Sequence, residues 1–141
     1  MNLSARTQYA CLAILELTRR HERDEPVPLR QIADTHGIPM PFLVQILQQL
    51  RAAGIVESTR GALGGYRLTR KPSALTLGEV VAATEGSSSQ SLSVDESSPV
   101  SRVLADAWRE AERAQRHCLD RISFSQLADR ARENADVMYY I

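Results

Sequence analysis

The sequence predicts a mainly α-helical protein that carries one small β-hairpin. Within residues 27–70, two short amphipathic helices meet at a glycine, and a glycine-rich turn follows between two short segments that alternate as strands. Beyond Val100 lies a longer amphipathic stretch, which predicts a separate helix. Two helices joined by a tight turn and followed by a hairpin make a winged helix-turn-helix, so the predicted fold is that domain plus a long C-terminal dimerisation helix.

The first predicted helix starts after Ser4, whose hydroxyl can cap it, and continues to about Arg20. Its apolar face is formed by Ala10, Ala13, Ile14 and Leu17. Cys11 lies one position from this face, and a lone helical cysteine is usually a small packed residue rather than a reactive one.

The helix-turn-helix follows. Pro28 should open its first helix, because proline loses no intrahelical hydrogen bond there, and Gly37 should close it in a left-handed conformation. A second helix from Pro39 buries a stripe of Leu43, Ile46, Leu47 and Leu50. Its other face has almost no charge and consists of Met40, Pro41, Val44, Gln45, Gln48 and Gln49.

That uncharged face favours contact with DNA bases. A glutamine amide can donate to and accept from adenine, which assigns base reading to Gln45 and Gln48, while Met40, Pro41 and Val44 offer apolar contacts to thymine methyl groups. The alternative, in which the glutamines only keep the helix soluble, stays open.

The hairpin is predicted from a strand at residues 55–58, a second strand from Tyr66, and the tip Arg60–Gly65 between them. Glycines at the tip allow the backbone to approach a phosphate, and arginines supply charge. Arg60 is the candidate for insertion into a minor groove, with phosphate contacts from Gly64, Gly65, Arg67 and Arg6. A surface hairpin with incidental arginines is the alternative.

The rest of the chain divides into three parts. A bracing helix from about Leu77 to Glu85 completes a winged domain at residues 1–86, and residues 87–99 belong to a Ser-rich, flexible loop. Residues 100–141 hold the long helix and a short last helix, which Ser123 and Gln126 begin as a capping box and which ends near Arg132. The long helix has an apolar seam at Val100, Leu104, Trp108, Ala111, Gln115, Cys118 and Ile122.

A seam this broad predicts a homodimer, because one small winged domain has too little surface to cover it. Packing of the helix on its own winged domain is the alternative. If two such helices cross near Cys118, the paired thiols could form a redox-sensitive disulfide, although a packed thiol is the commoner case in the cytosol.

Charge is divided between the two halves of the chain. The 141 residues carry no net charge, but residues 1–71 hold 10 Arg or Lys against 6 Asp or Glu, and residues 72–141 hold 7 against 11. The basic half contains the helix-turn-helix, as expected for a nucleic-acid binder. No apolar run is long enough to span a bilayer and no secretion pattern opens the chain, so we expect a cytoplasmic protein without membrane contact.

The sequence does not favour an enzyme. The three histidines are scattered, and the glycines at 61–65 lack the Lys-Ser/Thr and the following helix of a nucleotide-binding loop. We therefore predict no catalytic residues and no metal site. A winged domain used only for protein contacts remains the second hypothesis, and it predicts no salt-dependent affinity for duplex DNA.

Five segments resemble the Rrf-two family of bacterial transcription regulators. They are Leu3–Leu17, Val27–Ile38, Leu50–Leu68, Leu75–Gly86 and Arg121–Asp129, and the most specific is the wing motif Arg-Gly-x-x-Gly-Gly-Tyr at 60–66. The resemblance implies a homodimeric DNA-binding regulator, most simply a repressor of a partly palindromic operator. It also implies DNA-backbone contacts from the opening of the first helix, where Ser4, Arg6 and Thr7 stand.

The resemblance fails in one respect. Relatives that bind an iron-sulfur cluster place three cysteines in the loop, whereas residues from Gly86 to Pro99 contain none. Thiolates are the usual ligands of such clusters, so we expect no cofactor here. The signal that controls the protein is then open: a small molecule, a protein partner, or a thiol event at Cys118 or Cys11.

Overall fold

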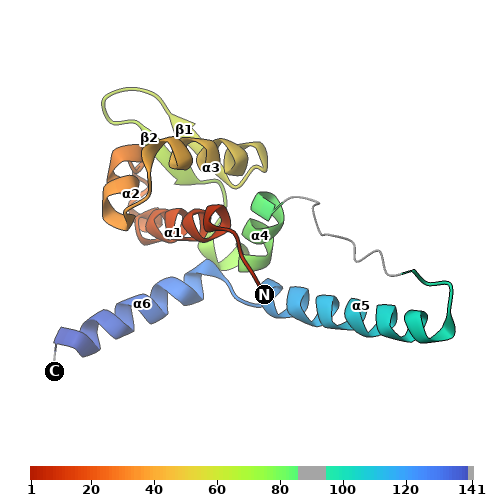
Figure 1. Ribbon diagram of the computed structural model, residues 1–141. Coiled ribbons are helices and arrows are strands. Elements are labelled where there is room, and N and C mark those ends of the chain that lie inside the picture. Colours follow the sequence, from red (N-terminus) through yellow and green to blue (C-terminus); the bar gives the residue numbers. More distant parts are fainter. Residues whose placement is uncertain (86–94, 140–141) are drawn as a thin grey trace.

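The computed structural model describes residues 1–85 and 95–139, and the side chains of the second segment as far as residue 136. It has a compact winged body and a C-terminal arm of two diverging helices (Figure 1). The winged body contains α1 (Ala5–Arg19), η1 (His21–Arg23), α2 (Leu29–His36), α3 (Met40–Ala52), β1 (Val56–Thr59), β2 (Gly65–Leu68), η2 (Pro72–Ala74) and α4 (Leu77–Glu85). The C-terminal arm contains α5 (Pro99–Asp120) and α6 (Phe124–Tyr139).

The core of the winged body lies where α1, α2 and α3 meet. The predicted stripes of α1 and α3 are fully or almost fully buried there: Ala10, Ala13, Ile14, Leu17, Leu43, Ile46, Leu47 and Leu50. Gly37 ends α2 with a φ of 63°, as predicted. Pro28 and Pro39 precede α2 and α3 rather than open them, because both have the extended ψ of a capping residue.

A buried carboxylate also joins α1 to α2. Glu16 is 1% exposed, and its Oε2 atom lies 3.2 Å from Arg19 Nη1 and 3.1 Å from His36 Nε2. A carboxylate out of water needs such partners, so this contact fixes the angle between the two helices.

The wing is an antiparallel hairpin in which Val56 pairs with Leu68 and Thr59 with Gly65. Gly65 therefore belongs to a strand rather than to the tip, and Ile55 stands just before β1. Val27 adds a third short edge, since its backbone exchanges hydrogen bonds of 2.8 and 2.9 Å with Tyr66. A Cβ at position 65 would lie 2.4 Å from the Val27 carbonyl oxygen, so only glycine allows this contact.

Helix α4 has the predicted bounds and is tied to the first turn of α1. Ser4 caps α1, and its backbone N–H and hydroxyl both donate to Glu85 Oε1 at 3.0 Å. The Thr7 hydroxyl donates to the same oxygen at 2.7 Å and lies 2.7 Å from the Thr84 hydroxyl. We call these four residues the Glu85 latch.

The C-terminal arm departs from the predictions at its boundaries. Helix α5 begins at Pro99, inside the predicted loop, because Ser98 and Ser101 form a capping box; residues 86–94 of that loop lie outside the described residues. The capping box of Ser123 and Gln126 is confirmed, but α6 continues to Tyr139 instead of ending near Arg132. Residues 133–139 contain neither glycine nor proline, so no strong helix breaker ends α6 near Arg132.

Residues around the start of α6 join the C-terminal arm to the winged body. Phe124 is fully buried in the core, and its N–H donates to the Leu75 carbonyl at 2.9 Å. The Leu77 N–H donates to the Ile122 carbonyl at 2.9 Å. Among the residues that the structure describes, no helix has the length and apolar character to cross a membrane.

Candidate DNA-binding interface

The open face of α3 is narrower than predicted. Pro41, Phe42, Gln45 and Gln48 are exposed, whereas Met40 and Val44 are partly covered. Gln49 does not belong to this face: its amide nitrogen donates to the Thr84 carbonyl at 3.4 Å, so the side chain is turned toward α4. Its Oε1 atom is buried and accepts no hydrogen bond from the described residues.

The first turn of α1 reaches the open face of α3. Arg6 Nη2 donates to Gln45 Oε1 at 3.2 Å, and the Arg6 guanidinium carbon lies 6.0 Å from the centre of the Phe42 ring. Tyr9 packs edge-on against Phe42, with ring centres 6.1 Å apart. Phe42 was absent from the predicted contacts, yet it stands three residues before Gln45, a spacing that puts both on one side of the helix.

The three residues predicted to contact DNA at the start of α1 differ in accessibility because of the Glu85 latch. Thr7 is 0% exposed, because its hydroxyl is enclosed between α1 and α4, so it has no surface to offer a phosphate. Ser4 is exposed, although its hydroxyl contacts Glu85. Hydrogen bonds from Thr7 and Ser4 lower the pKa of the Glu85 carboxyl. Arg6 is the residue of this turn whose charge faces α3.

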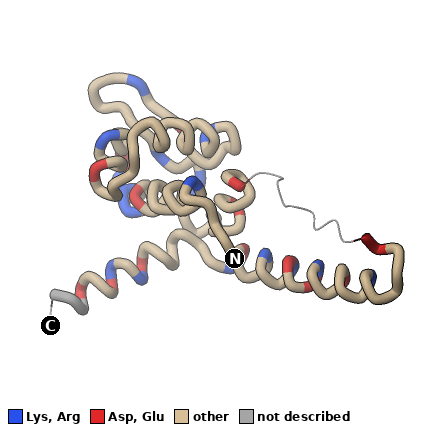
Figure 2. Tube along the Cα trace, in the orientation of Figure 1, with Lys and Arg blue, Asp and Glu red and all other residues tan. Residues whose placement is uncertain are grey.

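The wing holds one cation that differs from its neighbours. Figure 2 shows basic positions on the winged body, including its wing loop, and both basic and acidic positions along the C-terminal arm. Arg60 is exposed near the tip of the hairpin and, within the described chain, forms no ion pair. Arg67, in contrast, donates from Nε to Glu57 Oε1 at 2.6 Å and lies 3.4 Å from Asp24 Oδ1. Arg70 is paired with Glu79. Arg60 is therefore the wing cation with its charge least neutralised by the protein.

The glycines of the tip have a structural task. A Cβ at Gly64 would lie 2.2 Å from the Thr59 carbonyl oxygen, and the Gly64 N–H donates to the Gly61 carbonyl at 3.0 Å. That N–H is used inside the turn. The requirement for glycine at 64 and 65 thus follows from the hairpin itself, and the predicted phosphate contacts there stay predictions.

The seam of α5 faces outward. Val100 is 80% exposed, Leu104 49% and Trp108 48%, and Ala111, Gln115 and Cys118 are exposed as well. Ile122 is partly covered at the junction with α6. Ala105, one position from the seam, is the residue of α5 that is buried. The winged body of the same chain does not cover this apolar stripe.

The two cysteines have different surroundings. Burial raises the pKa of the Cys11 thiol to about 11, which keeps it protonated at neutral pH. Cys118 is exposed on α5. In the described segments, no group of three or more His, Cys, Asp or Glu side chains is arranged to hold a metal ion.

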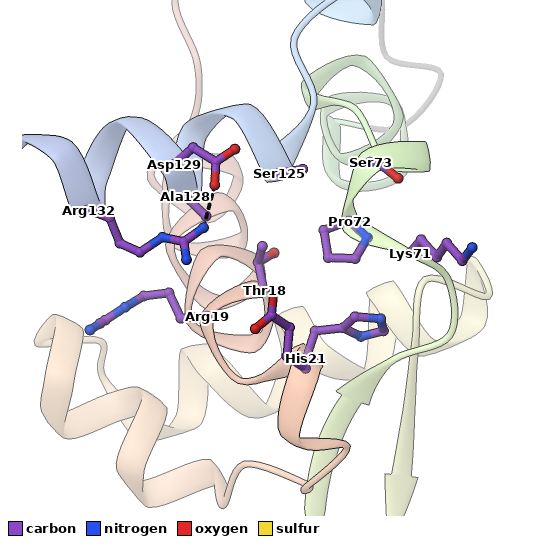
Figure 3. Close-up of a pocket in the computed structure, with 11 residues that line it drawn as sticks. Thr18, Arg19, His21, Lys71, Pro72, Ser73, Ser125, Ala128, Asp129 and Arg132 are labelled. Atoms are coloured by element: carbon purple, nitrogen blue, oxygen red, sulfur yellow. Dashed lines mark hydrogen bonds and ion pairs between the residues drawn. The ribbon is translucent and has the colours of Figure 1, made fainter.

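A cleft of about 510 Å³ lies between the end of α1, η2 and α6 (Figure 3). It mixes both charges, and its Asp129 and Arg132 are paired with each other. The sequence analysis missed it because its walls come from three separated segments: Thr18, Arg19, His21 and Glu22; Lys71, Pro72 and Ser73; Ser125, Ala128, Asp129 and Arg132.

Comparisons with known proteins agree with this geometry. The family model described as "Rrf2: Iron-dependent Transcriptional regulator" matches residues 3–130. The HTH-type transcriptional regulator CymR of Bacillus subtilis (strain 168) is 32% identical over 142 residues, which cover 100% of both chains. The regulator IscR of Aliivibrio salmonicida is 40% identical over 87 residues, 62% of this chain and 51% of that protein.

Solved structures give the same result. The structure titled "T. potens IscR" superposes with a TM-score of 0.79 at 31% identity, over 95% of this chain and 90% of that one. CymR (YrzC) of B. subtilis, titled the global cysteine regulator, also has a TM-score of 0.79, at 32% identity over 92% of this chain and 97% of its own. The likeness therefore includes the C-terminal arm as well as the winged body.

Proposed function

This chain belongs to the Rrf2 family and is a DNA-binding transcriptional regulator, and we propose that it acts as a homodimeric repressor on a partly palindromic operator. The resemblance of its motifs to that family is thereby confirmed. In this proposal the wing and the open face of α3 contact DNA, and the chain binds no iron-sulfur cluster.

The observation that carries the proposal is that one winged body presents both the unpaired Arg60 and the open face of α3. An unneutralised guanidinium on the wing and a helix face almost without charge in the same winged body suit a duplex, because phosphates and a narrow minor groove attract the cation and the major groove accepts the helix. In this proposal Gln45 and Gln48 contact base edges, Pro41 and Phe42 contact thymine methyl groups, and Arg60 enters the adjacent minor groove.

Dimerisation follows from the exposed seam of α5. Trp108 and Leu104 are about half exposed and lie on one stripe with Val100, and covering such a stripe is favourable by about 25 cal/mol per Å² of apolar surface. A second copy supplies a matching stripe by symmetry. Two winged bodies held in this way would present α3 to major grooves about 34 Å apart.

Repression by occlusion of a promoter is the simplest outcome, because the dimer would cover the operator with its two winged bodies. The cleft of Figure 3 lies at the junction of the winged body and the C-terminal arm, is lined by residues outside α3, β1 and β2, and is a candidate place for an effector.

We propose further that this member of the family carries no iron-sulfur cluster. The chain has two cysteines, one buried with a raised pKa on α1 and one on α5, and such a pair does not fit the cysteine-rich ligand set of these clusters. Anaerobically purified protein should show no visible absorbance and no bound iron or sulfide. A brown protein with near-stoichiometric iron and sulfide would refute this part of the proposal.

The substitution Arg60→Ala tests DNA binding. It should weaken binding to specific and random duplexes alike by roughly 1–3 kcal/mol and lower the salt slope by about one for each subunit contact. Arg130→Ala, which removes an exposed arginine of α6, is the matched control and should change neither quantity. Unaltered affinity and salt slope in the Arg60 variant would remove the wing from the interface.

A further inference from the structure

The orientation of the Gln45 amide is determined by Arg6. A guanidinium has only donors, so the atom that faces Arg6 Nη2 at 3.2 Å must be the amide oxygen of Gln45. Within the described chain, no hydrogen bond uses the Gln45 amide nitrogen, and the side chain is exposed on the open face of α3. The nitrogen is thus the group that this side chain can offer to a ligand.

Arg6 is itself held in place. Its guanidinium lies over the Phe42 ring, and Tyr9 supports that ring edge-on. Arg6 and Tyr9 come from one side of α1, and Phe42 and Gln45 from one side of α3, each pair three residues apart. The Arg6 guanidinium therefore lies over a ring of α3 that Tyr9 of α1 supports from the side.

We infer that Arg6 is a positioning residue that turns Gln45 so that it presents its amide N–H groups, and that the base opposite Gln45 is guanine rather than adenine. The inference rests on the proposed function and deepens it. Bidentate recognition of adenine needs the oxygen and the nitrogen of one amide directed together at N6 and N7. With the oxygen turned toward α1, that arrangement is lost.

Guanine matches the amide nitrogen that Gln45 leaves available. It presents two neighbouring acceptors, O6 and N7, to the two hydrogens of one amide nitrogen, while thymine presents one acceptor, O4. Cytosine presents a donor, N4–H₂, against which an amide nitrogen has nothing to give. The expected order at the position read by Gln45 is guanine, then thymine, then adenine, then cytosine.

The test uses full-length protein and a library of randomised duplexes, followed by measured affinities for the selected site with each of the four base pairs at every position. Replacing Gln45 by Ala should flatten the preference at one position in each half-site, which identifies the base that Gln45 faces. There the unaltered protein should prefer guanine over adenine by roughly tenfold.

Arg6→Met removes the donor but keeps a long side chain on Phe42. It should lower affinity for all duplexes, as expected if Arg6 also meets a phosphate, and should bring adenine level with or above guanine at that one position. Arg6→Lys keeps a donor and should retain the guanine preference. In the Gln45→Ala background, Arg6→Met should change overall affinity without changing any base preference, because the partner that Arg6 positions is gone.

Three results would overturn the inference: adenine as the preferred base in the unaltered protein, an Arg6→Met variant with the original preference, or an equal change of preference with and without Gln45. Failure of the proposed function looks different, since the unaltered protein would then select no duplex and would show no salt-dependent binding.

Discussion

Helices α1 and α5 behave in opposite ways, although both are amphipathic. In α1, 7 of 15 residues are buried, and every apolar side chain of its main stripe has partners within the winged body. In α5, Ala105 is the buried residue among 22, and Leu104 and Trp108 stand about half in solvent. The comparison teaches that the winged body buries its apolar stripes within one chain, whereas the apolar stripe of α5 is left uncovered by that chain, as the proposed dimer requires.

The largest expected effect comes from removing Phe124, the residue of the C-terminal arm that is fully buried in the core of the winged body. Phe124→Ala should lower the free energy of unfolding by about 3–5 kcal/mol, because the ring is fully buried and its removal leaves a cavity. Denaturation in guanidinium chloride at fixed protein concentration measures this. A loss below about 1 kcal/mol would mean that the start of α6 is not part of the core.

The next effect tests the difference between α1 and α5 directly. Trp108→Glu should weaken the dimer by about 2–4 kcal/mol, because it places a charge in a buried apolar interface. Light scattering after size-exclusion chromatography would report monomers at micromolar concentration. Glu110→Ala, about half a turn away on the same helix, is the matched control and should remain dimeric. Equal behaviour of the two variants would argue against dimerisation through this seam.

A smaller effect should appear at the Glu85 latch. The pKa of Glu85 is lowered in the folded protein, so its contribution to stability is present above its ordinary value of 4.5 and is lost as the pH falls through the lower folded value. Glu85→Gln should therefore melt roughly 2–4 °C below the unaltered protein at pH 7. Thermal melts from pH 7 to pH 3 should show this gap closing, and a constant gap would exclude an electrostatic origin.

The smallest effect is expected at Cys11. With a pKa of about 11, about one thiol in ten thousand is ionised at pH 7, so the residue should react slowly with iodoacetamide and with peroxide. A Cys118→Ser variant should keep its DNA affinity after mild peroxide treatment, and its labelling rate should rise steadily with pH. Loss of binding in that variant at neutral pH would make Cys11 the sensor after all.

Local and periodic signals predicted much of the fold. The Ser4 cap, the buried stripes of α1 and α3, the bounds of α4 and the capping box before α6 all depend on neighbours within a few residues in sequence. Caps and apolar periodicities are visible within a few residues of sequence, and this is why a pattern can predict them.

Contacts between residues far apart in the sequence could not be predicted from local patterns. Thr7 is enclosed by Thr84, Gln49 donates to α4, and Arg67 is neutralised by Glu57 and Asp24, although each had been placed on an accessible surface by the sequence analysis. The helix and the wing that were predicted to carry the DNA contacts are both present, and the contacts themselves stay predictions. Which of the candidate residues are accessible depends on the packing of α1 and α4 around α3, and the contact of Phe42 with Arg6 is a further example.

The first turn of α1 has two attachments, the Glu85 latch and the hydrogen bond from Arg6 to Gln45. On one side Thr7 is anchored to the last residue of α4, and on the other Arg6, its neighbour in sequence, reaches Gln45. A displacement of the end of α4 would therefore reach the Gln45 amide through a single turn of α1. If Gln45 contacts a base as proposed, the position of the end of α4 would then influence which base is preferred.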